Sequence, residues 1–445
     1  MGIWPLKNYI PIFLFFFIYL SIHCSLAIAE LFWAPKTLEN VVSNIAENIA
    51  STMTLTKITI TRMNREALRK LFTELEEFSL TEKYETKEEK LTFVNYTKLP
   101  PYFIIVITSS MTVAELLYYM NRVTEGIQIA FKFISNHISH YGMNIFMKGD
   151  LKIYRRNDKV AIDLKRIKKK IISNSKQNNS MGYKLPYRTL EIMDLRDSRI
   201  YALICAYQLI LVPAIILGYV GFDCMFVNLS IQVITQFSML SYKVKSIINN
   251  SKNYRDGMKK LILRHYRLIR LTETLEDNFN LTIMQQLFGT TIHICLSGYY
   301  VLMQASFAVF ADQVRPHSCK NYLLAWQTDK QADQFPYLTI SKETKDNLQS
   351  FLFFVYISSV ICTLFIYCFI GECFIQESSN YGNAIYNYDW YNLPVTESKF
   401  FLICMTRTKK PQFLTSGKFA VLSLSMFTDI LKTSIGYLSV LRTFV

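Results

Sequence analysis

The chain has 445 residues, of which 51% are apolar and only 19% are charged, and its formal net charge is +15. This composition excludes an ordinary soluble domain, because the apolar residues gather into runs of about 20 residues that can each cross a bilayer. The positive charge does not indicate a nucleic-acid-binding protein, since no basic stretch is interleaved with aromatic residues on a recognisable module. Basic loops beside apolar runs instead indicate contact with membrane lipid.

Catalytic and metal-binding patterns are missing from the sequence. The nine cysteines form no Cys-x-x-Cys pair, and the six histidines are scattered and belong to no nucleophile, zinc or phosphate-loop motif. Two acidic residues, Glu115 and Asp223, lie near the ends of apolar runs, and we interpret them as lacking partners for chemistry inside the membrane. The sequence therefore predicts no enzyme, no cofactor and no metal.

The first apolar run, Ile10 to Ala29, has two interpretations. Lys7 and the stretch Ala27-Ile28-Ala29 before Glu30 are compatible with a cleaved signal peptide. The run is nevertheless longer than the roughly 7 to 15 apolar residues of a signal sequence. A retained first transmembrane helix is the favoured prediction.

The remaining spans give a total of seven. The segment Leu38 to Ile60 is more polar, but its apolar residues recur at helical spacing, so it is expected to form helix two. The other five are clear spans, each long enough to cross the bilayer. They are Pro101 to Met120, Tyr201 to Val227, Ile283 to Phe310, Phe351 to Phe374 and Phe419 to Leu441.

The loop charges predict the orientation of these helices. The loops Arg62 to Lys98, Lys243 to Arg270 and Lys399 to Lys410 are basic, which favours a cytoplasmic N-terminus and an extracellular C-terminus. The connection between spans three and four is more basic still, but loops longer than about 60 residues contribute little to orientation. Within it, residues 126–180 lack sustained periodicity and are predicted to be a flexible insertion.

Two stretches are predicted to extend beyond the membrane. Apolar residues recur at helical spacing from Gln232 to Asn280, so spans four and five are expected to continue into the cytoplasm as amphipathic helices. The predicted organisation places helices one to four in residues 1–240 and a cytoplasmic anchor segment in 241–282. Helices five to seven then occupy 283–445, with a second anchor segment at about 375–414 and a pore helix at about 415–444.

Several motifs follow one another in the C-terminal third. They are Ile370-Gly371-Glu372, Trp390-Tyr391-Asn392-Leu393-Pro394, Arg407-Thr408-Lys409-Lys410-Pro411 and a last helix ending Ser439-Val440-Leu441. This ordered set resembles the closing signature of insect odorant receptors. Leu185-Pro186-Tyr187, His265 and Leu275-Glu276 resemble further landmarks of that family. The chain departs from the family at Ile435-Gly436, where an aromatic residue and then a serine are usual.

The resemblance implies an odorant-gated, non-selective cation channel. Four subunits, including a co-receptor, would surround a pore lined by the last helix in the plasma membrane of olfactory sensory neurons. Membrane lipid and a small volatile ligand are the other expected partners, and nucleic acid is not. Val440 and Leu441 match the apolar constriction, where a hydrophobic ring blocks ions by dewetting, and Thr443 matches a polar position at the pore mouth. Leu422 is expected to face lipid.

The family resemblance also implies a ligand pocket in the outer half of the membrane, among helices two, three, four and six. The candidate ligand-contacting residues are chosen by their position along these helices alone. The simplest interpretation of such apolar and aromatic residues is ordinary core packing. The candidates are Ile49, Met53, Met111, Ala114, Tyr118, Tyr207, Leu211 and Phe354.

A seven-helix receptor or a transporter without channel activity remains the alternative. A G-protein-coupled receptor would have an exterior N-terminus and an acidic-Arg-Tyr motif after helix three, and neither is indicated here. A transporter would show internal repeats or paired Gly/Pro-broken helices.

Overall fold

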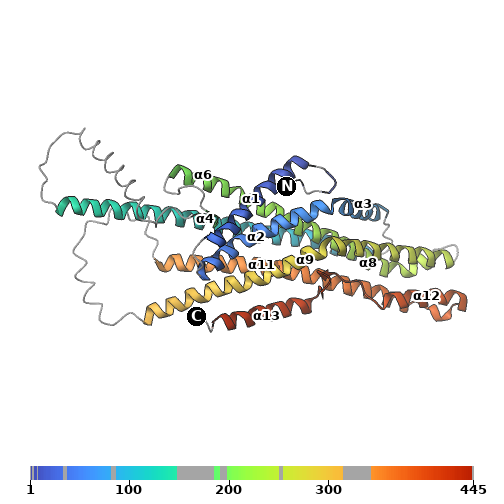
Figure 1. Cartoon of the computed structure of the whole chain (residues 1–445). Coiled ribbons are helices and arrows are strands. Elements are labelled where there is room, and N and C mark those ends of the chain that lie inside the picture. Colours follow the sequence, from blue (N-terminus) through green and yellow to red (C-terminus); the bar gives the residue numbers. More distant parts are fainter. Residues whose placement is uncertain are drawn as a thin grey trace.

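The computed structural model describes residues 9–33, 38–81, 87–147, 185–190, 198–249, 254–313 and 342–442, with residues 2 and 5–7 before them. Within these ranges the regular elements are helices apart from one two-stranded hairpin. Four long helices run side by side in an elongated bundle (Figure 1). They are α4 (Lys87–Met147), α8 (Gly221–Asn249), α9 (Tyr254–Gln313) and α11 (Lys342–Tyr386).

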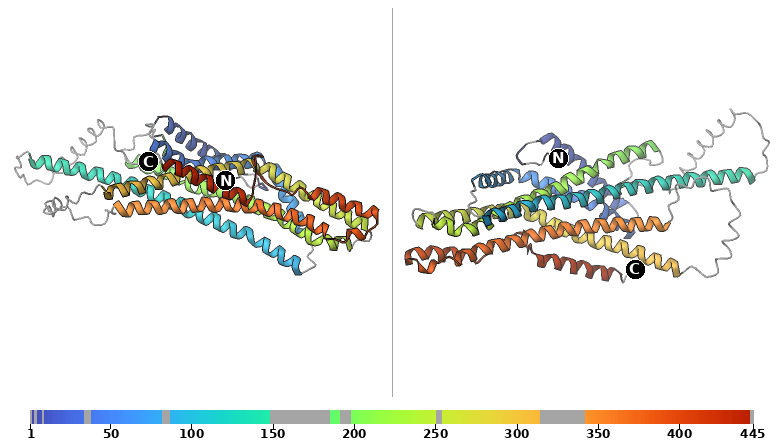
Figure 2. Two further views of the ribbon diagram at one scale, coloured as in Figure 1. Left: turned by 90° about the horizontal axis from the view of Figure 1, so that it is seen from below. Right: turned by 180° about the vertical axis from the view of Figure 1, so that it is seen from behind.

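Apolar helices long enough to cross a membrane make up much of this bundle. Four such segments occur in the described ranges: Ile10–Trp33, Lys87–Thr124, Arg199–Asn249 and Phe354–Asn392. The first is α1 (Ile10–Trp33), and the more polar α2 (Leu38–Met63) packs against it. Both run obliquely to the long helices of the bundle (Figures 1 and 2). The predicted helix at 38–60 is therefore confirmed.

Helices occur in two segments that were predicted to connect the membrane spans. The loop between spans two and three contains α3 (Arg65–Thr81), whose apolar Leu68, Leu71 and Leu75 are buried. These residues recur every three or four positions, so the helix buries one face although its sequence is highly charged. The flexible insertion predicted from residue 126 is wrong for its first part, because α4 continues to Met147. Residues 148–180 lie outside the described ranges.

Span four is interrupted near its outer end. It consists of α6 (Ser198–Leu209), α7 (Leu211–Ile215), the π-helical turn η1 (Ile216–Val220) and α8. Pro213 lacks an N–H and its ring collides with the carbonyl four residues earlier, so the regular ladder cannot pass Leu209. The predicted helical character of the stretch from Gln232 to Asn280 is confirmed for the described residues, because α8 continues to Asn249 and α9 begins at Tyr254. The extension of these helices into the cytoplasm stays a prediction.

The last helix begins later than predicted. After α11 come the short turn η2 (Trp390–Asn392), α12 (Val395–Thr408), and a hairpin of β1 (Thr415–Ser416) and β2 (Ala420–Val421). Gly417 and Lys418 both adopt positive φ, which reverses the chain. Only then does α13 (Leu424–Arg442) start, so residues 419–423 are not part of the helix.

The hairpin is fixed to α9 and α11. The Glu276 carboxylate accepts hydrogen bonds from the backbone N–H of Thr415, at 2.8 Å, and from its hydroxyl. Leu422, which we expected to face lipid, is fully buried, and a side chain at Gly371 would collide with its backbone. The expectation for Leu422 is therefore wrong, because this residue precedes α13 and packs against Gly371 of α11.

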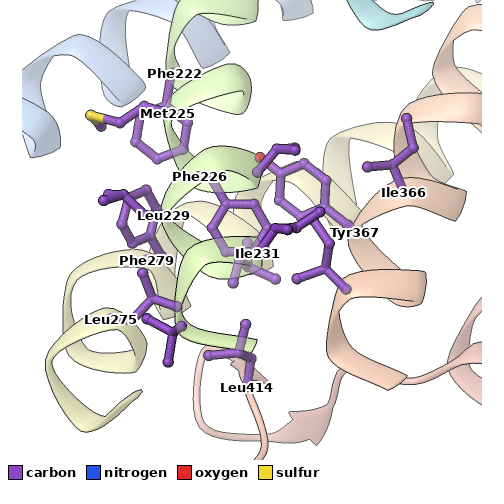
Figure 3. Packing of buried hydrophobic residues seen from close by; sticks show 14 of the residues in the cluster. Phe222, Met225, Phe226, Leu229, Ile231, Leu275, Phe279, Ile366, Tyr367 and Leu414 are labelled. Carbon is purple, nitrogen blue, oxygen red and sulfur yellow. The ribbon is translucent and has the colours of Figure 1, made fainter. Parts of the chain in front are cut away.

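The core of the bundle lies where α8, α9 and α11 cross. The ring of Phe226 stacks on Tyr367 of α11, with 4.6 Å between centroids, and it also lies 5.2 Å from Phe279 of α9. Phe222, one turn away, contacts the same Phe279 ring, as Figure 3 shows. These aromatic contacts fix the three helices at the level where α2 also reaches the bundle.

Candidate functional site: the intramembrane cluster and the last helix

Most of the nominated ligand residues lie inside the bundle. Met53, Met111, Ala114 and Leu211 are buried, whereas Ile49, Tyr118 and Tyr207 are partly buried and pack on the same core. Phe354 is different, because 69% of its surface is exposed in the single chain. The structure therefore gathers seven of the eight candidates into the bundle and leaves Phe354 on its outside.

Tyr187 is the centre around which part of this set is arranged. Its ring lies 5.9 Å from Tyr118 and 6.1 Å from Tyr119, and the edge of His23 meets it at 6.0 Å. Gln208 holds the Tyr187 backbone from both sides: its side-chain N–H donates to the carbonyl at 3.0 Å, and its oxygen accepts the backbone N–H at 3.1 Å. These two hydrogen bonds fix the extended segment that contains Tyr187 among helices α1, α4 and α6.

Glu115 is a polar group that the sequence analysis dismissed. It lies on α4 one turn from Met111, it is buried, and its carboxylate accepts a hydrogen bond of 3.2 Å from the Tyr187 hydroxyl. The interpretation that it has no partner is therefore wrong. Its partner is 72 residues away in the sequence, and no local spacing could have linked the two.

Two further contacts extend the cluster towards α9 and α11. The Ser359 hydroxyl donates to the Met111 sulfur at 2.6 Å, and the Tyr356 hydroxyl lies 3.1 Å from His293 Nε2. Met53 of α2 packs against Gly289 of α9, where any side chain would collide with the Met53 thioether. The cluster thus presents aromatic rings, thioethers and a few hydrogen-bonding groups, which is the chemistry of a site for a small, mostly apolar molecule.

The other dismissed carboxylate, Asp223, forms a buried ion pair. Lys57 Nζ of α2 lies 2.5 Å from Asp223 Oδ1 of α8, and both side chains are 0% exposed. The Tyr367 hydroxyl of α11 donates to the same oxygen at 2.7 Å. The Lys57 ammonium also lies 3.5 Å from the centroid of the Tyr219 ring. The interpretation of Asp223 as unpartnered is wrong because its cation comes from a helix 166 residues away in the sequence.

The candidate pore residues lie at the end of α13. Val440 is 56% exposed in the single chain, as are the nearby apolar residues Ile435 and Tyr437 to a similar extent. Leu438 instead faces α9, where it fills the space beside Gly298. Leu441 belongs to α13 but its side chain lies outside the described part, and Thr443 lies outside it altogether. The helix is therefore two-sided, with one face on the bundle and one uncovered.

The end of the molecule that carries α12 is packed through aromatic rings. Phe401 stacks on Tyr388 with 5.2 Å between centroids and contacts Tyr254, while His265 lies 4.4 Å from Tyr381. Burial, together with the nearby Arg407 guanidinium, lowers the pKa of His265 to about 4. The imidazole is consequently neutral at physiological pH.

A helical bundle of membrane-spanning length, with a buried cluster of aromatic and polar groups and a last helix exposed on one face, is the architecture of a multi-pass membrane protein. The family comparison is more specific. The 7tm odorant receptor family matches residues 169–311 and 337–435, which together exceed half of the chain. The chain belongs to this insect odorant receptor family, a non-enzymatic family of ligand-gated channels whose N-terminus is intracellular.

Individual relatives are distant in sequence. The chain is 23% identical to Odorant receptor 9a of Drosophila melanogaster over 43% of this chain and 39% of that protein. It is 22% identical to Odorant receptor 13a of the same species over 55% of this chain and 51% of that protein. These matches span about half or less of the relatives' length.

Solved structures match over nearly the whole chain. The insect olfactory receptor OR5 from Machilis hrabei in complex with eugenol has a TM-score of 0.64 and 11% sequence identity, covering 97% of this chain and 88% of that chain. A second structure of the same receptor gives a TM-score of 0.63 at 11% identity. At this identity the likeness concerns the fold, and it confirms the predicted all-helical membrane class.

Proposed function

We propose that this chain is the odorant-binding subunit of a ligand-gated, non-selective cation channel. It would act in the plasma membrane of olfactory sensory neurons, in a heterotetramer with a co-receptor. The observation that carries the proposal is the two-sided last helix: Leu438 packs on α9, whereas Val440 lies on an uncovered apolar face. An apolar face at the end of a hydroxyl-rich helix suits a gate that excludes water when closed.

The intramembrane cluster supports the ligand half of this proposal. Met53, Met111 and Tyr118 lie on α2 and α4, and the polar groups of Glu115 and Tyr187 stand among them. A small volatile molecule would be recognised there by shape and dispersion, with one hydrogen bond for orientation. The OR5 structure with eugenol, a small aromatic phenol, has the same fold and is consistent with such a ligand.

The aromatic end around α12 supports assembly. A groove there is lined by Leu402, Ile403, Thr406, Arg407 and Lys410. Exposed apolar residues beside basic ones suit a contact with a neighbouring subunit, since an apolar patch gains stability when another chain covers it. This end would be the cytoplasmic anchor of the tetramer.

The test is electrical. Cells expressing the co-receptor alone, this chain alone, or both are exposed to a panel of volatiles while cation current is recorded. The proposal predicts odorant-evoked currents that appear only with both chains and differ in ligand spectrum from the co-receptor alone. Surface-expressed chain that gives no odorant-dependent current over a broad panel contradicts it, as does robust odorant-evoked current from this chain alone.

A further inference from the structure

The buried ion pair between Lys57 and Asp223 is placed at the junction of several helices. Lys57 belongs to α2, Asp223 to α8, and the Tyr367 hydroxyl that shares Asp223 Oδ1 belongs to α11. A fourth helix, α9, is connected through Tyr219: the ring lies 3.5 Å from the Lys57 ammonium, and the hydroxyl accepts a hydrogen bond of 2.6 Å from Gln286 of α9. One charge pair therefore fixes the relative positions of four helices.

The Lys57 and Asp223 charges are buried in surroundings that compensate them only when they are paired. Both side chains are 0% exposed, and the second carboxylate oxygen of Asp223 has no hydrogen-bond partner among the described residues. Separating two charges leaves each without compensation, because both side chains are shielded from solvent. A movement of α2 relative to α8 is thus opposed by the pair.

One end of this network lies beside the candidate ligand site. Met53 is one helical turn from Lys57, and its thioether fills the space beside Gly289 of α9. A molecule that enters next to Met53 has to displace this side chain or the helix that carries it. The displacement acts directly on the Lys57–Asp223 pair.

The other end reaches the start of the last helix. Gly371 and Glu372 follow Tyr367 by about one turn of α11. Gly371 is in close contact with the Leu422 backbone, and the Glu372 carboxylate accepts the backbone N–H of Leu424 at 3.1 Å, where α13 begins. A carboxylate at a helix N-terminus is favourable, so α13 is tied to α11 at its first turn.

Resting on the proposed channel function, we propose that Lys57, Asp223 and Tyr367 form an intramembrane clamp that couples the ligand side of the bundle to the pore helix. The clamp holds α2, α8 and α11 in the resting arrangement, and α11 carries that constraint to α13 through Gly371 and Glu372. Ligand binding beside Met53 works against the clamp, so weakening it makes the channel easier to open.

The first variant removes one hydroxyl. Tyr367→Phe keeps the ring that stacks on Phe226 and deletes the hydrogen bond to Asp223. The matched control is Tyr381→Phe on the same helix, because the Tyr381 hydroxyl is buried without a hydrogen-bond partner in the described structure. With the co-receptor present, Tyr367→Phe should raise basal current and lower the half-maximal odorant concentration by roughly fivefold, and Tyr381→Phe should change neither.

The second set separates coupling from folding. Lys57→Met and Asp223→Leu each leave one buried charge unpaired and should lower surface protein by roughly tenfold. The double variant Lys57→Met/Asp223→Leu leaves no charge, so surface protein should recover while the channel shows the sensitised response of Tyr367→Phe. Surface biotinylation measures protein independently of current.

Each result decides the proposal. Wild-type surface levels in both single variants would overturn the buried pair itself, and this arm needs no channel activity. A recovered double variant with wild-type basal current and sensitivity, or a Tyr367→Phe response equal to that of Tyr381→Phe, would leave a purely structural pair and overturn the coupling. An expressed wild-type chain that never conducts with the co-receptor would instead refute the proposed function, while the surface-protein arm would still decide the pair.

Discussion

Two regions of this molecule bury ionisable side chains between helices, but one pairs opposite charges and the other surrounds a neutral group with aromatic rings. Beside α2, Lys57 and Asp223 form a pair that bridges helices distant in sequence. At the α12 end, His265 lies among the aromatic rings of Phe237 and Tyr381, with no ion pair to a carboxylate among the described residues. The first region depends on charge complementarity, and the second depends on apolar packing around a neutral imidazole.

Substitutions in the two regions should therefore have different effects on the protein. A buried charge pair opposes the separation of its two helices, and the loss of one partner strongly destabilises the protein. This behaviour suits an element that switches between two arrangements. An aromatic cluster loses stability in proportion to the atoms removed, which suits an element that stays fixed. The ligand-side region is thus expected to govern gating and the α12 end to govern assembly.

The largest expected effect at the α12 end comes from removing a ring. Phe401 is fully buried between Tyr388 and Tyr254, so Phe401→Ala should destabilise the protein by about 3–5 kcal/mol. The measurement is the thermal midpoint and the tetramer fraction of detergent-solubilised complex. Val395→Ala, at an exposed position of α12 outside the groove lined by Leu402 and Ile403, is the control. Equal effects of the two variants would show that packing does not hold this end.

A smaller effect is expected where α9 holds the hairpin. Glu276→Gln keeps one side-chain acceptor for Thr415 but removes the charge, and should destabilise by about 1–3 kcal/mol. Limited proteolysis between residues 409 and 423 should become faster. Glu273→Gln, which alters an exposed pair with Arg270, should leave the cleavage rate unchanged. A hairpin equally resistant in both variants would contradict the assigned role of Glu276.

The smallest expected effect is a pH dependence. Burial, with Arg407 nearby, lowers the folded pKa of His265 to about 4, below its usual value of 6.5. The unfolded chain therefore binds the proton first as pH falls, so this group's stabilising contribution is complete above about pH 6.5 and decreases towards pH 4. At pH 5.5 the loss should be about 1.4 kcal/mol.

The matched variant isolates that contribution. His265→Phe keeps a ring beside Tyr381 and cannot bind a proton, so the decrease in thermal midpoint between pH 7 and pH 5.5 should be smaller than in the wild type. An identical decrease in both proteins would assign the pH dependence to other groups.

The sequence predicted the elements better than the contacts between them. Apolar runs and periodicity located the spans and the helical continuation of spans four and five, because these are local properties. The charged helix α3 and the hairpin before α13 were missed, the first because charge concealed its buried stripe and the second because positive φ at Lys418 is not visible in a pattern. The domain boundaries remain predictions.

The candidate site was predicted only as a set of positions. Buried Met111 and Leu211 follow from helix placement, but the partners of Glu115 and Asp223 arise from helices brought together by folding. An intramembrane lysine such as Lys57 is itself a signal that a carboxylate must be close, and pairing it with Asp223 was within reach of charge reasoning alone.

The central claim is that α13 lines the pore with the face that carries Val440. Val440 and Leu438 are two residues apart and so point in nearly opposite directions on the helix. The measurement compares basal and odorant-evoked cation currents of Val440→Ser and Leu438→Ser with the co-receptor, normalised to surface protein. The account predicts raised basal current for Val440→Ser, because water persists at a polar constriction, and reduced surface protein without leak for Leu438→Ser. Unchanged basal current and ion selectivity in Val440→Ser would contradict the assignment of this helix to the pore.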